Sequence, residues 1–114
     1  MCPTKIVGLH NYYIKSGDNV DVEATLQVYQ NQLSTWMSMP YRELNFYLYN
    51  SDGKLEWQDS KYTGFFTDYG MARETINTKS LSLSPGKYIL TVKYGGNCFS
   101  GMNHYEAENA IHIH

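Results

Sequence analysis

The chain has 114 residues, and its 9 Lys and Arg against 11 Asp and Glu give a formal net charge of −2. This length fits one domain of ordinary size. We assign residues 1–114 to a single domain, because no linker or low-complexity stretch interrupts them. Near-neutral charge disfavours nucleic acid as a partner, since neutralising phosphates takes an excess of basic side chains. No apolar run approaches the roughly 20 residues that a spanning helix needs, so we expect no membrane span.

The first predicted elements are two strands. We expect one strand over residues 5–14. Residues 20–29 then alternate between apolar and polar side chains without a break, which is the period of a strand with one buried and one solvent-exposed face. The side chains expected to point inward are those of Val20, Val22, Ala24, Leu26 and Val28.

The middle of the chain predicts a loop and a hairpin. We interpret residues 31–40 as a loop, because Pro40 stops the short helical turn that the Trp and Met residues there would form. Residues 43–49 predict a strand with Leu44, Phe46 and Leu48 on its inner face. A tight turn at residues 50–53 and a short strand over residues 54–57 complete the hairpin.

The last third of the chain predicts three more strands. A turn at residues 68–70 leads into a strand ending at residue 76, and a Pro85-Gly86 turn leads into a strand over residues 88–94. The final strand covers residues 105–114. The expected inner side chains are those of Tyr88, Leu90, Val92, Tyr94, Tyr105, Ala107, Asn109, Ile111 and Ile113.

Short strands separated by regular turns predict an all-β fold, an antiparallel β-sandwich of about seven strands. Tyr88, which follows the Pro85-Gly86 turn, is a candidate corner tyrosine whose hydroxyl ties a loop to its strand. The two cysteines, Cys2 and Cys98, fit three readings that remain open: unpaired thiols, a mutual disulfide, or lipidation of Cys2.

Four ordered motifs resemble the bacterial and archaeal Ig-like domains of surface proteins, such as invasin/intimin-type adhesin repeats. They are residues 17–26 (GDNVDVEATL), residues 44–53 with their Asp-Gly turn, residues 67–72 (TDYGMA), and residues 83–97 (LSPGKYILTVKYGGN). The resemblance covers about residues 5–114. It implies an Ig-like fold and a non-enzymatic module of a cell-surface or secreted protein, with a structural spacer or adhesion role.

The resemblance also implies an extracellular or cell-surface location, although the N-terminal residues carry no secretion signal. In such proteins the domain has its termini at opposite ends and is strung between neighbouring domains of a larger chain. We expect a monomer from four charged residues on the predicted outer strands, which discourage edge pairing. They are Lys5, Lys15, Glu106 and Glu108.

The sequence carries no catalytic motif, and we predict neither an enzyme nor a cofactor. There is no Gly-x-Ser-x-Gly nucleophile elbow. Gly95-Gly96 follows a predicted strand and opens no helix, so it is a turn and not a phosphate loop.

We also predict no metal site, after weighing three arrangements. Cys98, Met102 and His104, with His10, are the residue types of a copper-binding sandwich protein, which stays a remote alternative because their order differs from the blue-copper pattern. Two further sets are interpreted as surface residues. They are the His112/His114 pair, expected to lie on a frayed chain end, and the turn carboxylates Asp52, Asp59 and Asp68, which would bind Ca²⁺ only if they converged.

The aromatic residues are the best candidates for ligand binding, because aromatics make up 15% of the chain. Tyr47 and Tyr49 alternate with the predicted core residues and should therefore face outward. Together with Trp57, Tyr41 and Trp36 they would form a flat platform for a glycan or a surface protein. The alternative is structural: surface tyrosines are common on strands, and Trp57 or Trp36 would then fill the core.

Overall fold

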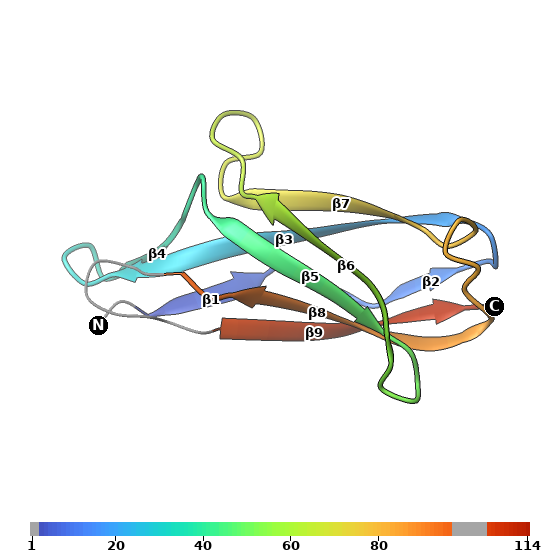
Figure 1. The fold of residues 1–114 in the computed structure, drawn as a ribbon. Helices are drawn as coiled ribbons and strands as arrows, with labels where there is room; N and C mark the ends of the chain where they lie inside the picture. The colour runs from blue at the N-terminus through green and yellow to red at the C-terminus, as the bar shows by residue number, and fades with distance from the viewer. Residues whose placement is uncertain (1–2, 97–104) are drawn as a thin grey trace.

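The computed structural model describes residues 3–96 and 105–114, with side chains from residue 107 onward in the second range. Within these residues the chain is all-β and forms nine strands (Figure 1). They are β1 (Thr4–Val7), β2 (Tyr12–Ile14), β3 (Asn19–Gln30), β4 (Thr35–Ser38), β5 (Glu43–Tyr49), β6 (Leu55–Tyr62), β7 (Met71–Asn77), β8 (Gly86–Tyr94) and β9 (Tyr105–Ile113). The described part of the chain contains no helix long and apolar enough to cross a membrane.

The strands form two facing sheets. Sheet A has the order β1-β3-β4, and β7 pairs with the first half of β3. Sheet B has the order β2-β9-β8-β5-β6. All pairings between these strands are antiparallel except that of β2 with β9, which is parallel. The predicted β-sandwich is therefore confirmed, with nine strands where about seven were expected.

The core lies between the sheets and consists mostly of the residues that the alternation pointed inward, with Ile6, Met39, Ala72, Ile76 and Leu83 in addition. Every predicted inner residue of β3 and β5 is buried, because a strand turns successive side chains to opposite faces. In β8, Tyr88, Leu90, Val92 and Tyr94 are also buried. In β9, Ile111 and Ile113 are buried, whereas Ala107 and Asn109 are only half-buried.

The predicted first strand over residues 5–14 is wrong as a single element. Gly8 has a φ of +91°, a backbone conformation that favours glycine, and it breaks the segment into β1 and β2. The chain changes sheets at this point, because β1 pairs with β3 in sheet A and β2 pairs with β9 in sheet B.

The predicted loop over residues 31–40 contains β4, which is a second correction. β3 extends beyond its partner β7, whose pairing ends at Thr25, so residues 27–30 have free hydrogen-bonding groups on that edge. β4 pairs with them after a turn at residues 31–34. Pro40 stops a helix but does not prevent a strand that ends two residues earlier.

The molecule is elongated, with extents of 47 × 29 × 19 Å, and its two termini lie at opposite ends of the long axis (Figure 1). β2 pairs only with residues 111–113 of β9, so the positions of Glu106 and Glu108 lie on a part of β9 that pairs with β8 alone among the described strands. Lys5, another of the four charged residues that were expected on outer strands, lies on the edge strand β1.

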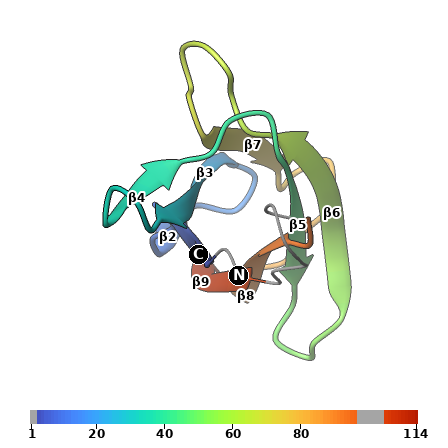
Figure 2. The same cartoon turned by 90° about the vertical axis from the view of Figure 1, so that its left-hand side faces the viewer.

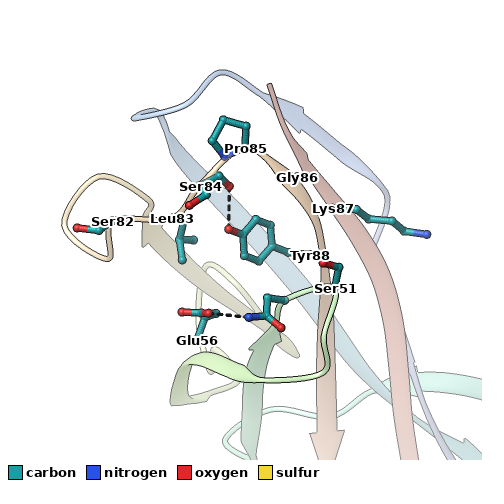
Figure 3. Close-up of a pocket in the computed structure, with 10 residues that line it drawn as sticks. Ser51, Glu56, Ser82, Leu83, Ser84, Pro85, Gly86, Lys87 and Tyr88 are labelled. Atoms are coloured by element: carbon teal, nitrogen blue, oxygen red, sulfur yellow. Dashed lines mark hydrogen bonds between the residues drawn. The ribbon is translucent and has the colours of Figure 1, made fainter.

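The prediction that Tyr88 is a corner tyrosine is confirmed. Tyr88 Oη donates a hydrogen bond of 2.7 Å to the carbonyl oxygen of Ser84, four residues earlier, across the Pro85-Gly86 turn (Figure 3). Burial raises the pKa of the Tyr88 hydroxyl, which keeps it protonated as a donor. The adjoining small hollow, of about 210 Å³, is lined mainly by this turn and by the β5–β6 hairpin. We therefore assign Tyr88 a structural role, in which it stabilises the fold.

Candidate functional site

The five aromatic residues predicted to form a platform lie in four different surroundings. Tyr47 and Tyr49 face outward on β5, as expected, and their rings stack with centroids 6.4 Å apart. Both are half-buried, and the Lys93 ammonium lies 5.3 Å from the centre of the Tyr47 ring. These two residues form a small aromatic pair on the outer face of sheet B.

The two tryptophans lie elsewhere. Trp57 pairs with the buried Leu48 across the β5–β6 ladder, and it packs against the core from the inner face. Trp36 belongs to β4 in sheet A, where its ring packs edge-on against Tyr29 at 5.4 Å. Lys5 Nζ lies 4.2 Å from the centre of the Trp36 ring. Neither tryptophan reaches the Tyr47–Tyr49 pair, so the structure does not form one platform from the five residues.

Tyr41 is the predicted residue that belongs to a larger exposed aromatic group. Its ring lies 5.6 Å from that of Tyr62 and 6.3 Å from that of Phe65, which it meets edge-on. The loop between β6 and β7 adds Phe66 and Tyr69, and all five rings are at least half exposed. We call Tyr41, Tyr62, Phe65, Phe66 and Tyr69 the aromatic cluster. An exposed apolar group of this size usually has a binding role.

The loop that carries most of the cluster projects away from both sheets (Figures 1 and 2). Thr63 fixes its base to the β4–β5 connection. The Thr63 hydroxyl is buried, donates to the Met39 carbonyl oxygen at 2.8 Å, and accepts from the Arg42 amide at 2.9 Å. The backbone adds bonds from Tyr41 N to Thr63 O and from Thr63 N to Arg42 O. Two segments that are distant in sequence are thereby joined beneath the cluster.

Two glycines close the neck of the projecting loop. The Gly70 amide donates to the Gly64 carbonyl at 2.9 Å. A Cβ on Gly64 would collide with the carbonyl of Asp68, and one on Gly70 would lie 2.5 Å from the Cβ of Ser38. Gly70 also has a φ of +76°, so both positions require glycine. Arg73 on β7 reaches Asp68 at 3.5 Å, which adds a weak tie at the surface.

Tyr41 itself has a φ of +56°, a conformation that is unusual for a bulky side chain. Backbone strain of this kind is maintained only where the surrounding structure imposes it, and it concentrates at binding and catalytic sites. Here the Thr63 hydrogen bonds impose it, and the result is an aromatic ring held out in solvent.

Sequence reasoning missed four of the five cluster residues: Tyr62, Phe65, Phe66 and Tyr69. One signal was present, because consecutive phenylalanines between Gly64 and Gly70 do not alternate and cannot both point into a sandwich core. The meeting of Tyr41 with Tyr62 carries no local signal, since it depends on the pairing of β5 with β6.

Among the described residues, no three His, Cys, Asp or Glu side chains are placed to hold a metal ion. His112 is not frayed: it lies in β9 and stacks on Tyr13 at 4.6 Å. The carboxylates Asp52, Asp59 and Asp68 lie on the β5–β6 turn, on β6 and on the projecting loop. Cys2, Cys98, Met102 and His104 lie outside the described residues.

Comparison with known proteins places the chain in a class by its fold. No family model matches it, and no curated protein matches it in sequence. Its whole length aligns with 96% of AggA, the major subunit of aggregative adherence fimbriae type I from Escherichia coli, at 9% identity and a TM-score of 0.51. It also aligns with 27% of a family 123 glycoside hydrolase from Clostridium perfringens, at 9% identity and a TM-score of 0.53.

A third likeness, to the CARDB domain of a Pyrococcus furiosus protein in complex with di-metal ions, covers 99% of this chain and 93% of that one, at 8% identity and a TM-score of 0.46. At these identities the likeness concerns the fold. The chain is an Ig-like β-sandwich. The narrower resemblance to invasin/intimin-type repeats stays a prediction.

Proposed function

We propose that this chain is a non-enzymatic Ig-like module of a cell-surface or secreted protein, and that it acts in adhesion by presenting the aromatic cluster to a partner. The observation that carries the proposal is the exposure of five aromatic rings on two segments that buried Thr63 joins. Leaving such rings in water is unfavourable, and a loop of ordinary polar residues would close the same turn without that cost.

The arrangement suits a binding surface because it is held in place before a partner arrives. Rings on a rigid base lose little conformational freedom on binding, and this lowers the entropic cost of association. The base consists of Thr63 and the glycine neck, so the rings are presented by the scaffold and not by a loose chain. AggA, a subunit of adherence fimbriae, gives the proposed surface location a parallel at the level of fold.

A spacer role is the second candidate, and the shape of the domain favours it. The termini lie at opposite ends of an axis 47 Å long, so neighbouring domains would be held apart by the length of the sandwich (Figure 1). This role is compatible with binding at the cluster, because the loop that carries most of it projects sideways from the long axis (Figure 1). The non-enzymatic part of the proposal rests on the sequence, which carries no nucleophile elbow and no phosphate loop.

The test compares binding of the wild type and of a Tyr62→Ala/Phe65→Ala variant to printed arrays of purified extracellular proteins and of oligosaccharides. Tyr13→Ala is the matched control, because Tyr13 is 66% exposed, like Phe65, but lies on β2 in sheet B. We expect discrete binding that falls at least tenfold in the double variant and is unchanged in the control. Equal binding by all three proteins, or none by the wild type, would refute the binding role and favour the spacer.

A further inference from the structure

Beside the aromatic cluster lies an open hollow of about 460 Å³, at the end of sheet B where β5 begins and where β6 and β8 end. Tyr41 and Tyr62 belong both to the cluster and to the wall of this hollow. Tyr94, Gly95 and Gly96 form another part of the lining, and a side chain at Gly96 would meet the Tyr94 hydroxyl within 2.7 Å. The hollow is thus bounded by aromatic rings and bare backbone.

The other lining residues are planar hydrogen-bonding groups. Arg42, Glu43 and Asn45 follow Tyr41 along the chain, and all three line the hollow. Ser60 Oγ donates to Asn45 Oδ1 at 2.6 Å, which orients the carboxamide and directs its Nδ2 to other acceptors. Arg42 is held through its backbone, whose amide donates to Thr63. The guanidinium, carboxylate and carboxamide groups offer both donors and acceptors at the rim of the tyrosine rings.

The charges of this lining balance. Among the described residues of the lining, Arg42 contributes one positive charge and Glu43 one negative charge, and the others are neutral. A phosphate, sulfate or acidic peptide would meet a repelling carboxylate beside its attracting guanidinium, and a cation would meet the reverse. The lining therefore favours a neutral ligand that is rich in hydrogen-bonding groups.

The geometry points to a neutral oligosaccharide as the ligand of this hollow, an inference that rests on the proposed binding role of the cluster. A pyranose ring has an apolar face of C–H groups and a rim of hydroxyls. The C–H face suits a tyrosine ring, which is apolar in its body and polar at its tip. The hydroxyls, each a donor and an acceptor, suit the guanidinium, carboxylate and carboxamide beside it. A protein partner would instead use the apolar tip of the loop, where Phe66 is 88% exposed.

The test uses an array of neutral oligosaccharides of glucose, mannose, galactose, xylose and N-acetylglucosamine, with sulfated, sialylated and uronic-acid glycans printed alongside. Hits are titrated by calorimetry against the wild type, Tyr62→Ala and Asn45→Ala, which remove one ring and one polar group from the lining. Tyr13→Ala is the matched aromatic control, since Tyr13 neither lines the hollow nor belongs to the aromatic cluster. Thermal melting of each variant shows that it is folded.

We expect a neutral oligosaccharide to bind, Tyr62→Ala and Asn45→Ala each to weaken that binding about tenfold or more, and the Tyr13→Ala control to bind as the wild type does. Binding of charged glycans only, or neutral binding that ignores both substitutions, would overturn the inference. If no glycan binds but an extracellular protein does, and Tyr62→Ala and Phe66→Ala both abolish this, the ligand class is wrong and the proposed function stands. If neither kind of probe binds, both proposals fail.

Discussion

Glu74 on β7 provides a pH-dependent test of the packing between the two sheets. It pairs with the buried Val22 in sheet A, and Asp59 on β6 pairs with the buried Phe46 in sheet B, so both carboxyl groups lie on the core side of their strands. They meet where the edges of β7 and β6 approach one another (Figures 1 and 2). Partial burial raises the pKa of Glu74 from 4.5 to about 7, with a hydrogen bond and the negative charge of Asp59 as further causes.

The direction in which stability changes with pH follows from proton binding to Glu74. The folded state holds the Glu74 proton more tightly than the unfolded state does, so stability is highest below pH 4.5 for this group and falls as the pH rises toward about 7. Unscreened, that pKa difference corresponds to about 3 kcal/mol. Glu74 is only partly buried, and solvent screening reduces the expected cost of its charged form to about 1–2 kcal/mol.

The perturbation is Glu74→Gln, which keeps the shape of the side chain and removes its titration. Urea unfolding of both proteins at pH 5 and pH 8 gives the difference in stability at each pH, and this difference cancels the titration of carboxylates that do not interact with Glu74. We expect the free energy of unfolding of the variant, relative to that of the wild type, to be about 1–2 kcal/mol higher at pH 8 than at pH 5. Glu43→Gln, at an exposed site, controls for the loss of one carboxylate. A Glu74→Gln difference that is the same at both pH values, within about 0.3 kcal/mol, would refute the argument.

Three further substitutions test the core, the corner and the loop. Leu90→Ala removes a fully buried side chain between the sheets and should cost about 2–5 kcal/mol in urea unfolding; a cost below about 1 kcal/mol would contradict the assignment of Leu90 to the core. Tyr88→Phe deletes the 2.7 Å bond to Ser84 and should cost about 1 kcal/mol, whereas unchanged stability would mean that the corner contributes nothing. Gly64→Ala forces a collision with the Asp68 carbonyl, so we expect faster amide exchange in the projecting loop and weaker partner binding, with the core amides unchanged.

The strands that the sequence predicted well are those whose signal is local. β3 and β5 alternate over most of their length and β8 over part of it, and alternation depends only on which face of one strand is buried. β4 was missed for the opposite reason. Nothing within residues 35–38 distinguishes them from a loop, and their pairing depends on the end of β3 that β7 leaves unpaired.

The residues of the candidate site also divide into those with a local sequence signal and those that depend on contacts between distant segments. The sequence identified Tyr41 as a candidate ligand-binding residue. The outward direction of Tyr47 and Tyr49 followed from the alternation of side chains along their strand. The phase of Trp57 could not be read from its short predicted strand, and its inward direction follows from its register opposite Leu48. Tyr62 and Phe65 join Tyr41 because Thr63 bonds to Met39 and Arg42 across more than twenty residues of sequence.

By itself the sequence determined the all-β class, several of the turns, and most residues of the core, because each of these depends on neighbours within one strand or one turn. The tertiary structure alone decided which strand edges pair, which sheet each end of the first segment joins, and which exposed rings come together. These outcomes depend on hydrogen bonds and contacts between segments far apart in the chain, and a binding surface built across the β4–β5 and β6–β7 connections exists only after those contacts have formed.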